Sequence, residues 1–286
     1  MEIILNTAYS FKQKGHRPNQ EDARFPDRDV ADGLFFVVCD GVGGNVAGEV
    51  ASQTVSQCLG QSIGEVLANG PFSDDVLSNV LMKAYNGLRK ARRTDTQNMA
   101  TTMTMLVFHT AGVTMSHIGD SRIYQFRKEE GIHYRSKDHS LVQELVSIGK
   151  LTDEQARNHP RSNLITRSMS ANATDYCPAT TYATADIMDG DVFLLCTDGV
   201  WSECTDDELT ELFLSDAPDR DIMQRLSEMC RDSDDNNTAT MVRVAQVIRD
   251  ADDEDSCTPA HTIDVAPKRT GGWAGTLANL VNKILK

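Results

Sequence analysis

Two segments of this chain share one design, a short apolar run that ends in Asp-Gly. Residues Val37 to Val42 read VVCDGV, and Leu194 to Val200 read LLCTDGV. A short apolar run closed by a turn signal fits a buried strand better than a helix. Glycine lets the chain turn sharply and lets its own carbonyl approach an ion. The repeat therefore predicts two strands whose exits hold carboxylates rigidly.

Two further acidic groups extend this set across most of the chain. Glu21-Asp22 lies near the start, and Asp234-Asp235-Asn236 lies near the end. Carboxylate oxygens select hard cations such as Mg²⁺ or Mn²⁺ over zinc, which prefers nitrogen and sulfur. The pattern predicts a divalent metal site, whereas a single Asp-Gly would favour a simple strand-to-helix turn.

Composition limits the classes of protein that fit. The chain has 286 residues and is 40% hydrophobic, which allows one large domain with a tail. Its net charge of −14 argues against nucleic-acid binding and against attraction to anionic membranes. The seven cysteines are scattered without CxxC spacing, and no apolar stretch is long enough to span a bilayer. We expect a cytoplasmic protein with reduced thiols and no transmembrane segment.

Hydrophobic periodicity predicts the order of helices and strands. Helices are expected at 46–67, with Asn45 as N-cap, and at 73–93, 206–215 and 219–231; strands are expected at 34–39, 192–196 and 239–247. The segment 101–134 predicts several consecutive strands that pair antiparallel, because their turns are short. The polar stretch from Ser140 to Arg161 is expected to be helical and to form a mobile flap. Runs of strands followed by runs of helices indicate an α+β fold.

The composition changes after Arg249. Residues 250–255 are an acidic run and 259–272 resemble a linker, so we expect a domain at 1–249 and a linker at 250–272. Residues 273–286 place apolar side chains on one helical face. This amphipathic helix would dock a partner, a membrane or its own domain, or would be an ordinary terminal helix packed or frayed.

Six ordered motifs resemble those of metal-dependent protein phosphatases of the PP2C type, most closely the bacterial branch. They are Arg17 to Asp22, Asp40 to Gly44 with Gly48-Glu49, Gly119 to Arg122, Asp138 to Ser140, Asp198 to Trp201, and Asp235-Asn236 with Thr238. The resemblance implies a four-layer αββα sandwich of two antiparallel sheets flanked by helices. It also implies hydrolysis of phosphoserine and phosphothreonine in proteins, opposing a serine/threonine kinase.

The resemblance assigns site residues by position. The implied ligands of two Mn²⁺ or Mg²⁺ ions are Glu21, Asp40, the Gly41 carbonyl, Asp198 and Asp235, with Asp120 at a weaker third metal. Asp22 would orient the attacking water, and there would be no covalent enzyme intermediate. Arg17 has a planar fork that suits phosphate oxygens, although a surface ion pair is the commoner role of a lone arginine.

The chemistry of phosphate esters supports the same ligand types. Their uncatalysed hydrolysis is so slow that enzymes reach accelerations of up to ~10²¹, more than a single general base supplies. Some eukaryotic members of this family have a histidine directly after the first Asp-Gly, proposed to protonate the leaving oxygen, whereas this chain has Val42. His139 and His159 are other candidates for this acid, although a structural role fits each of them better. A phosphatase-like regulator without turnover and a structural calcium protein are the alternative classes.

Overall fold

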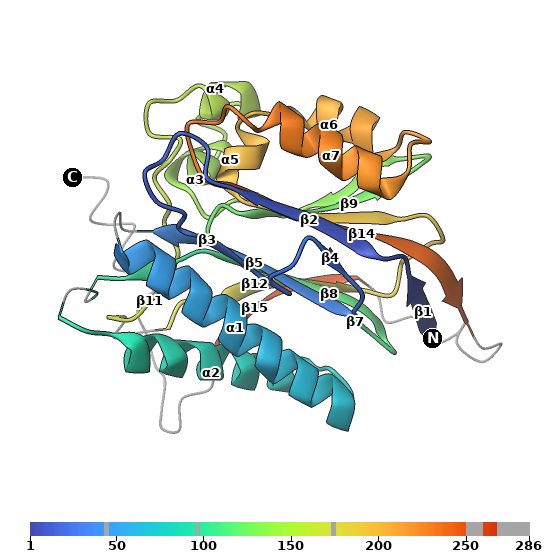
Figure 1. Ribbon diagram of the computed structural model, residues 1–286, viewed down its shortest axis with the longest axis horizontal. Helices are drawn as coiled ribbons and strands as arrows, with labels where there is room; N and C mark the ends of the chain where they lie inside the picture. The colour runs from blue at the N-terminus through green and yellow to red at the C-terminus, as the bar shows by residue number, and fades with distance from the viewer. Residues whose placement is uncertain (43–45, 95, 97, 173–175, 250–259, 268–286) are drawn as a thin grey trace.

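The computed structural model describes residues 1–42, 46–94, 96, 98–172, 176–249 and 260–267. Two sheets lie face to face, and helices cover both outer faces (Figure 1). Neighbouring strands in both sheets pair antiparallel. The expected α+β class and αββα sandwich are therefore confirmed.

The first sheet carries the helices of the C-terminal half. Its strands are β1 (Glu2–Leu5), β2 (Ala8–Gln13), β4 (Val30–Ala31), β9 (Arg122–Arg127), β10 (Gly131–Arg135), β13 (Val192–Cys196) and β14 (Asn237–Ile248). Their order is β10-β9-β13-β14-β2-β4, and β1 also pairs with β14. Helices α6 (Asp206–Phe213) and α7 (Asp219–Met229) pack on its outer face. Strand β14 thus pairs with the first two strands of the chain.

The second sheet carries the long N-terminal helices. Its strands are β3 (Asp22–Phe25), β5 (Phe35–Val42), β6 (Ala100–Thr101), β7 (Met103–His109), β8 (Gly112–Ile118), β11 (Met169–Ser170), β12 (Ala179–Thr184) and β15 (His261–Val265). Their order is β11-β6-β5-β7-β8-β12-β15, with β3 also on β5. Helices α1 (Val46–Asn69) and α2 (Asp74–Ala91) cover its outer face.

Burial on both faces explains the continuous apolar runs. In β5, Val37 packs toward α1 and α2, whereas Phe36 and Val38 pack between the sheets. In β13, Leu194 packs under α6 and α7, whereas Leu195 packs between the sheets. A strand that is covered on both sides needs apolar side chains at successive positions. The predicted strands and the four predicted helices of the domain are confirmed, with ends shifted by a few residues.

The predicted helical stretch after Ser140 forms α3 (Leu141–Ser147) and α4 (Asp153–Arg157) between β10 and β11. Ser140 caps α3, and a Thr152–Gln155 capping box begins α4. The predicted flap ended at Arg161, but the segment before β11 continues to residue 168, and we call residues 141–168 the flap. It lies beside α5 (Asp198–Trp201) at one end of the sandwich (Figure 1).

Two expectations are wrong in part. Consecutive strands pair at β7–β8 and β9–β10, but β8 and β9 lie in different sheets, because β7 and β12 already occupy both edges of β8. The linker predicted over 259–272 contains β15, which pairs with β12 because that strand leaves an edge open. Asn45, the acidic run 250–255 and the helix expected at 273–286 lie outside the described residues.

Candidate metal centre

The first Asp-Gly turn lies at the end of β5. Asp40 is opposite Asp22 in the antiparallel pairing of β5 with β3, which brings the first two acidic motifs side by side. The Asp40 amide donates to Thr102 Oγ1 at 2.9 Å, and Thr101 Oγ1 donates to the Asp40 carbonyl at 2.8 Å. The backbone of Asp40 is thus fixed on both sides.

The second Asp-Gly turn begins a helix. Asp198 is the first residue of α5, with Thr197 before it as N-cap. Thr197 Oγ1 donates to Asp22 Oδ2 at 3.0 Å and accepts from the Thr238 amide at 3.0 Å. One hydroxyl therefore connects β3, α5 and β14. A carboxylate in the first turn of a helix is favoured by the helix dipole.

Asn236, just before β14, binds the loop that follows β2 at the pocket, a role that the sequence did not predict. Its side-chain amide donates to the carbonyls of Lys14 and Asn19 at 2.8 and 2.9 Å, and its Oδ1 accepts from the Glu21 amide at 2.7 Å. Asn236 is buried. The loop that carries Glu21 is therefore held against the loop that carries Asp235.

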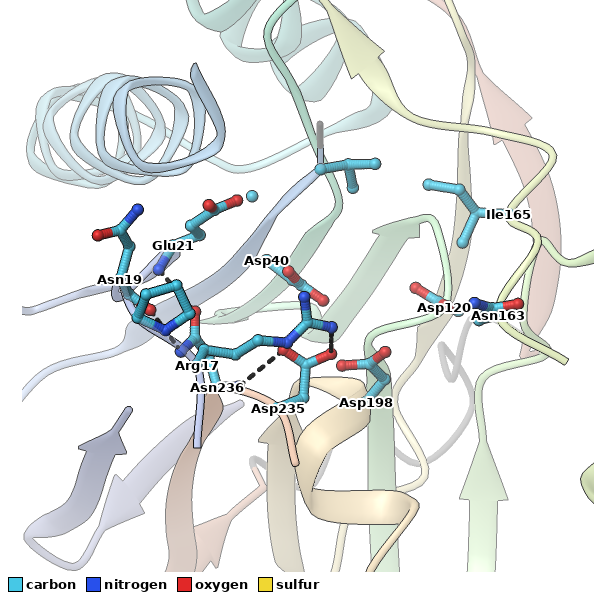
Figure 2. A pocket seen from close by; sticks show the side chains of 13 residues that line it. Arg17, Asn19, Glu21, Asp40, Asp120, Asn163, Ile165, Asp198, Asp235 and Asn236 are labelled. Atoms are coloured by element: carbon cyan, nitrogen blue, oxygen red, sulfur yellow. Dashed lines mark hydrogen bonds and ion pairs between the residues drawn. The ribbon is translucent and has the colours of Figure 1, made fainter. Parts of the chain in front are cut away.

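The expected site residues converge. A pocket of about 400 Å³ is lined by Arg17, Pro18, Asn19, Glu21, Asp40, Gly41, Val42, Asp120, Asn163, Ile165, Asp198, Asp235 and Asn236. Figure 2 shows Glu21 and Asp120 on opposite sides of Asp40, with Asp198 and Asp235 beside one another. Asp22 lies behind this surface and is only 2% exposed. Asn163 and Ile165 come from the flap, and no sequence motif marked them.

Glycine is required where three segments meet at the pocket. A Cβ on Gly41 would lie 2.3 Å from the Gly48 carbonyl oxygen and 2.7 Å from that of Glu21. A Cβ on Gly48 would lie 2.2 Å from Glu21 Oε2. At Gly41 the clashes are with backbone atoms, so any larger residue there would push β5, the start of α1 and the Glu21 loop apart. This packing explains the Gly48 of the second motif.

Buried carboxylates in this pocket repel one another. Burial, then the charges of Asp198 and Asp22, raise the pKa of Asp40 well above its ordinary value. Burial and the charge of Asp235 raise the pKa of Asp198 to about 6. Burial is also the main reason that the pKa of Asp120 is raised. Such repulsion favours protons or cations among the carboxylates.

Arg17 supplies one positive charge. Its Nη2 donates to Asp235 Oδ2 at 2.7 Å (Figure 2). No three His, Cys, Asp or Glu side chains of the described chain already surround a single point closely enough to hold an ion. The residues nevertheless fit divalent cations, because the donors are all oxygen and Asp198 Oδ1 is buried without a hydrogen-bond partner. Arg17 competes with a cation for Asp235 Oδ2.

The two candidate histidine acids lie elsewhere. His139 Nδ1 accepts from the Gly119 amide at 3.1 Å, and its ring stacks on His117 with centroids 4.5 Å apart. Burial lowers the pKa of His139 to about 2. His159 Nδ1 accepts from the Arg161 amide at 3.1 Å. Neither histidine lines the pocket, so the geometry favours the structural roles.

Comparison with known proteins agrees with this geometry. Residues 12–245 match the family model for protein phosphatase 2C. Protein phosphatase PhpP of Streptococcus pneumoniae is 34% identical over 148 residues, which are 51% of this chain and 58% of that protein. The match thus spans little more than half of that relative's length.

Solved structures extend the comparison to most of the fold. The serine/threonine phosphatase PstP/Ppp of Mycobacterium tuberculosis superposes with a TM-score of 0.73 at 28% identity, over 85% of this chain and all of that one. The catalytic domain of PstP in complex with two manganese ions gives a TM-score of 0.70 at 26% identity, over 86% of this chain and all of that one. The family model matches residues 12–245, which are most of this chain and include all five pocket carboxylates. This chain therefore belongs to the protein phosphatase 2C family.

Proposed function

We propose that this chain is a metal-dependent protein phosphatase that hydrolyses phosphoserine and phosphothreonine by direct attack of water. One observation carries the proposal: carboxylates from residues 21, 40, 120, 198 and 235 face one pocket beside an arginine. Among the described residues that line the pocket there is no cysteine, serine or histidine, so carboxylates are the common covalent nucleophiles present, and we propose that they hold cations instead. Family membership and the phosphatase names of the relatives support the same reaction.

Bound cations would offset the mutual repulsion of the pocket carboxylates. A phosphate ester would be repelled by these carboxylates unless bound cations reversed the local field. Two Mn²⁺ or Mg²⁺ ions, with a weaker third, would supply a water whose pKa falls from 15.7 toward roughly 7 and would neutralise charge on the phosphate. Glu21, Asp40, the Gly41 carbonyl, Asp198 and Asp235 would hold the pair, and Asp120 would serve the third.

Arg17 and Asp22 would position the phosphate and the attacking water. Arg17, released from Asp235, would present two N–H groups to the phosphate oxygens. Asp22 lies behind the pocket, where the hydrogen bond from Thr197 fixes one carboxylate oxygen. Its other oxygen, Oδ1, is buried without a partner and would accept a hydrogen bond from the attacking water. No neighbouring side chain needs to act as a nucleophile.

The test is turnover of a phosphoserine peptide with Mn²⁺, with chelator, and with Asp198→Asn. We expect activity only with metal and a loss of at least about 10²-fold in the variant, because removal of one electrostatic group at a reacting centre has effects of that size. Asp216→Asn is the matched control, since Asp216 lies outside the pocket and its side chain is fully exposed. Peptide binding without turnover in the unchanged chain would overturn the proposal.

The cellular setting belongs to the same proposal. Substrates would be cytoplasmic phosphoproteins of a serine/threonine kinase, and residues 273–286 would form a docking helix. None of the described helices is long and apolar enough to cross a membrane. A chain ending at residue 267 should keep peptide turnover and lose recruitment to its docking site in a pull-down or vesicle assay. If recruitment were unchanged, residues 273–286 would not be the docking element.

A further inference from the structure

A pair of thiols lies outside the catalytic pocket. Cys204 and Cys230 have their Sγ atoms 4.0 Å apart, and both are buried under α6 and α7, at 1% and 0% exposure. Six cysteines are described, and all are free thiols. A disulfide needs sulfurs about 2.05 Å apart, so the two sulfurs must approach by about 2 Å to bond.

Each thiol lies a few residues from a pocket aspartate along the chain: Cys204 follows Asp198, and Cys230 precedes Asp235. The Cys204 amide donates to the Val200 carbonyl at 3.1 Å, just after the helix that starts with Asp198. Cys230 is the C-cap of α7, and its carbonyl accepts from the Ser233 amide at 3.2 Å. Ser233 Oγ in turn accepts from the Asp235 amide at 3.2 Å. A bond between the sulfurs would therefore connect the Asp198 helix to the Asp235 turn.

We propose that Cys204 and Cys230 are a redox-modification site, at which a hydroperoxide forms a disulfide that weakens divalent metal binding at Asp198 and Asp235. The second half of this statement rests on the proposed function. With hydrogen peroxide, a sulfur–oxygen bond forms at Cys204, the oxygen–oxygen bond breaks and water leaves. Cys230 then attacks the sulfenic sulfur, and a second water leaves. Two thiols lose two electrons and two protons, and the peroxide is reduced to two waters.

The environments of the two sulfurs assign their roles. The hydrogen bond from the Cys230 thiol lowers the pKa of Cys204, and the same contact raises the pKa of Cys230. Burial and the charges of Glu208 and Glu203 oppose this shift, and the Arg157 guanidinium, which donates to the Cys204 carbonyl at 3.4 Å, adds to it. The thiolate is the form that attacks peroxide, so in the arrangement with Cys230 as the donor, Cys204 is the attacking thiol and Cys230 the resolving one.

The size of the effect follows from the distances. The sulfurs must approach from 4.0 Å to about 2.05 Å, and this displacement is shared between the two segments. Metal–ligand distances tolerate only about 0.2 Å of change. Disturbing the support of a ligand lowers metal affinity by roughly 10–100-fold. Linkage requires the reverse effect at equilibrium as well, so bound Mn²⁺ should make the disulfide easier to reduce.

The experiment uses the full chain with Cys257→Ser, which removes the one thiol outside the described residues. After peroxide treatment, mass spectrometry should show loss of two hydrogens and a crosslinked peptide containing both cysteines. Calorimetry should show Mn²⁺ affinity reduced at least about tenfold, with recovery after dithiothreitol. In a buffer of reduced and oxidised dithiothreitol, saturating Mn²⁺ should lower the fraction of crosslinked chain at equilibrium.

Matched variants separate this site from general oxidation. Cys204→Ser and Cys230→Ser should each abolish the crosslink and keep the Mn²⁺ affinity under peroxide, with alanine variants used if a buried serine prevents folding. Cys58→Ser, on α1, should leave both results unchanged. No crosslink, or a crosslink with unchanged Mn²⁺ affinity, would overturn the proposal. These readouts need no phosphatase activity, so failure of the proposed function would be seen separately.

Discussion

Gly48→Ala tests whether close packing at the pocket, and not fold stability, sets metal affinity. The added Cβ would lie 2.2 Å from Glu21 Oε2 and 2.9 Å from the Gly41 carbonyl oxygen. Glu21 Oε2 would have to retreat by about 1 Å, well beyond the roughly 0.2 Å tolerance of metal–ligand distances. We expect a loss of Mn²⁺ affinity of at least 10–100-fold, or about 1.4–2.7 kcal/mol.

The free energy of unfolding of the metal-free protein should change little. Gly48 is in the first turn of α1, where alanine favours the helix by up to about 1 kcal/mol. The closer clash is with the end of a flexible side chain and is relieved by rotation of Glu21, and the Gly41 carbonyl oxygen, at 2.9 Å, needs to move by only a few tenths of an ångström. Urea unfolding with chelator should therefore agree with the unchanged chain to within about 1 kcal/mol.

Gly64→Ala is the matched control on the same helix. Its Cβ would meet Phe35 at 3.5 Å, an ordinary contact, so it should leave Mn²⁺ affinity unchanged and raise stability slightly. Mn²⁺ affinity is measured by calorimetry in all three proteins. If Gly48→Ala bound Mn²⁺ as tightly as the unchanged chain, the steric argument for the Glu21 cradle would be refuted.

Three other perturbations have defined outcomes. Arg17→Ala should raise the KM for a phosphopeptide about tenfold or more, since a hydrogen bond to a charge contributes about 1.5–3 kcal/mol. Arg17→Lys should recover only part of the lost affinity, because lysine lacks the planar fork. An unchanged KM in steady-state kinetics would show that Arg17 does not bind the phosphate. Asn236→Ala should cost about 2–3 kcal/mol in urea unfolding, because it leaves buried backbone groups unpaired; a loss below ~0.5 kcal/mol would contradict its clamp role. Burial lowers the pKa of His109 from 6.5 to about 4, so the stability it contributes is full above pH 6.5 and is lost as pH falls toward 4. Unfolding of His109→Gln at several pH values should lack that part of the acid sensitivity, by about 1 kcal/mol per pH unit, and parallel pH curves would contradict it.

The sequence determined the local elements and the chemistry of the pocket. The apolar runs before Asp40 and Asp198 predicted β5 and β13, because strands covered on both faces need apolar residues in succession. Oxygen-bearing side chains at fixed turns predicted the donor type. Those signals are local, so they can be read without knowledge of the neighbouring elements.

Tertiary structure decided which elements meet. Periodicity specifies the buried faces of a strand but leaves open which edge pairs with which partner, so the separation of β8 from β9 and the pairing of β15 with β12 could not be predicted. Arg17 contacts Asp235, 218 positions away, where Asn236 clamps the two loops together. Asn163 of the flap lines the same pocket. Such contacts depend on packing between distant segments, and no pattern within either segment encodes them.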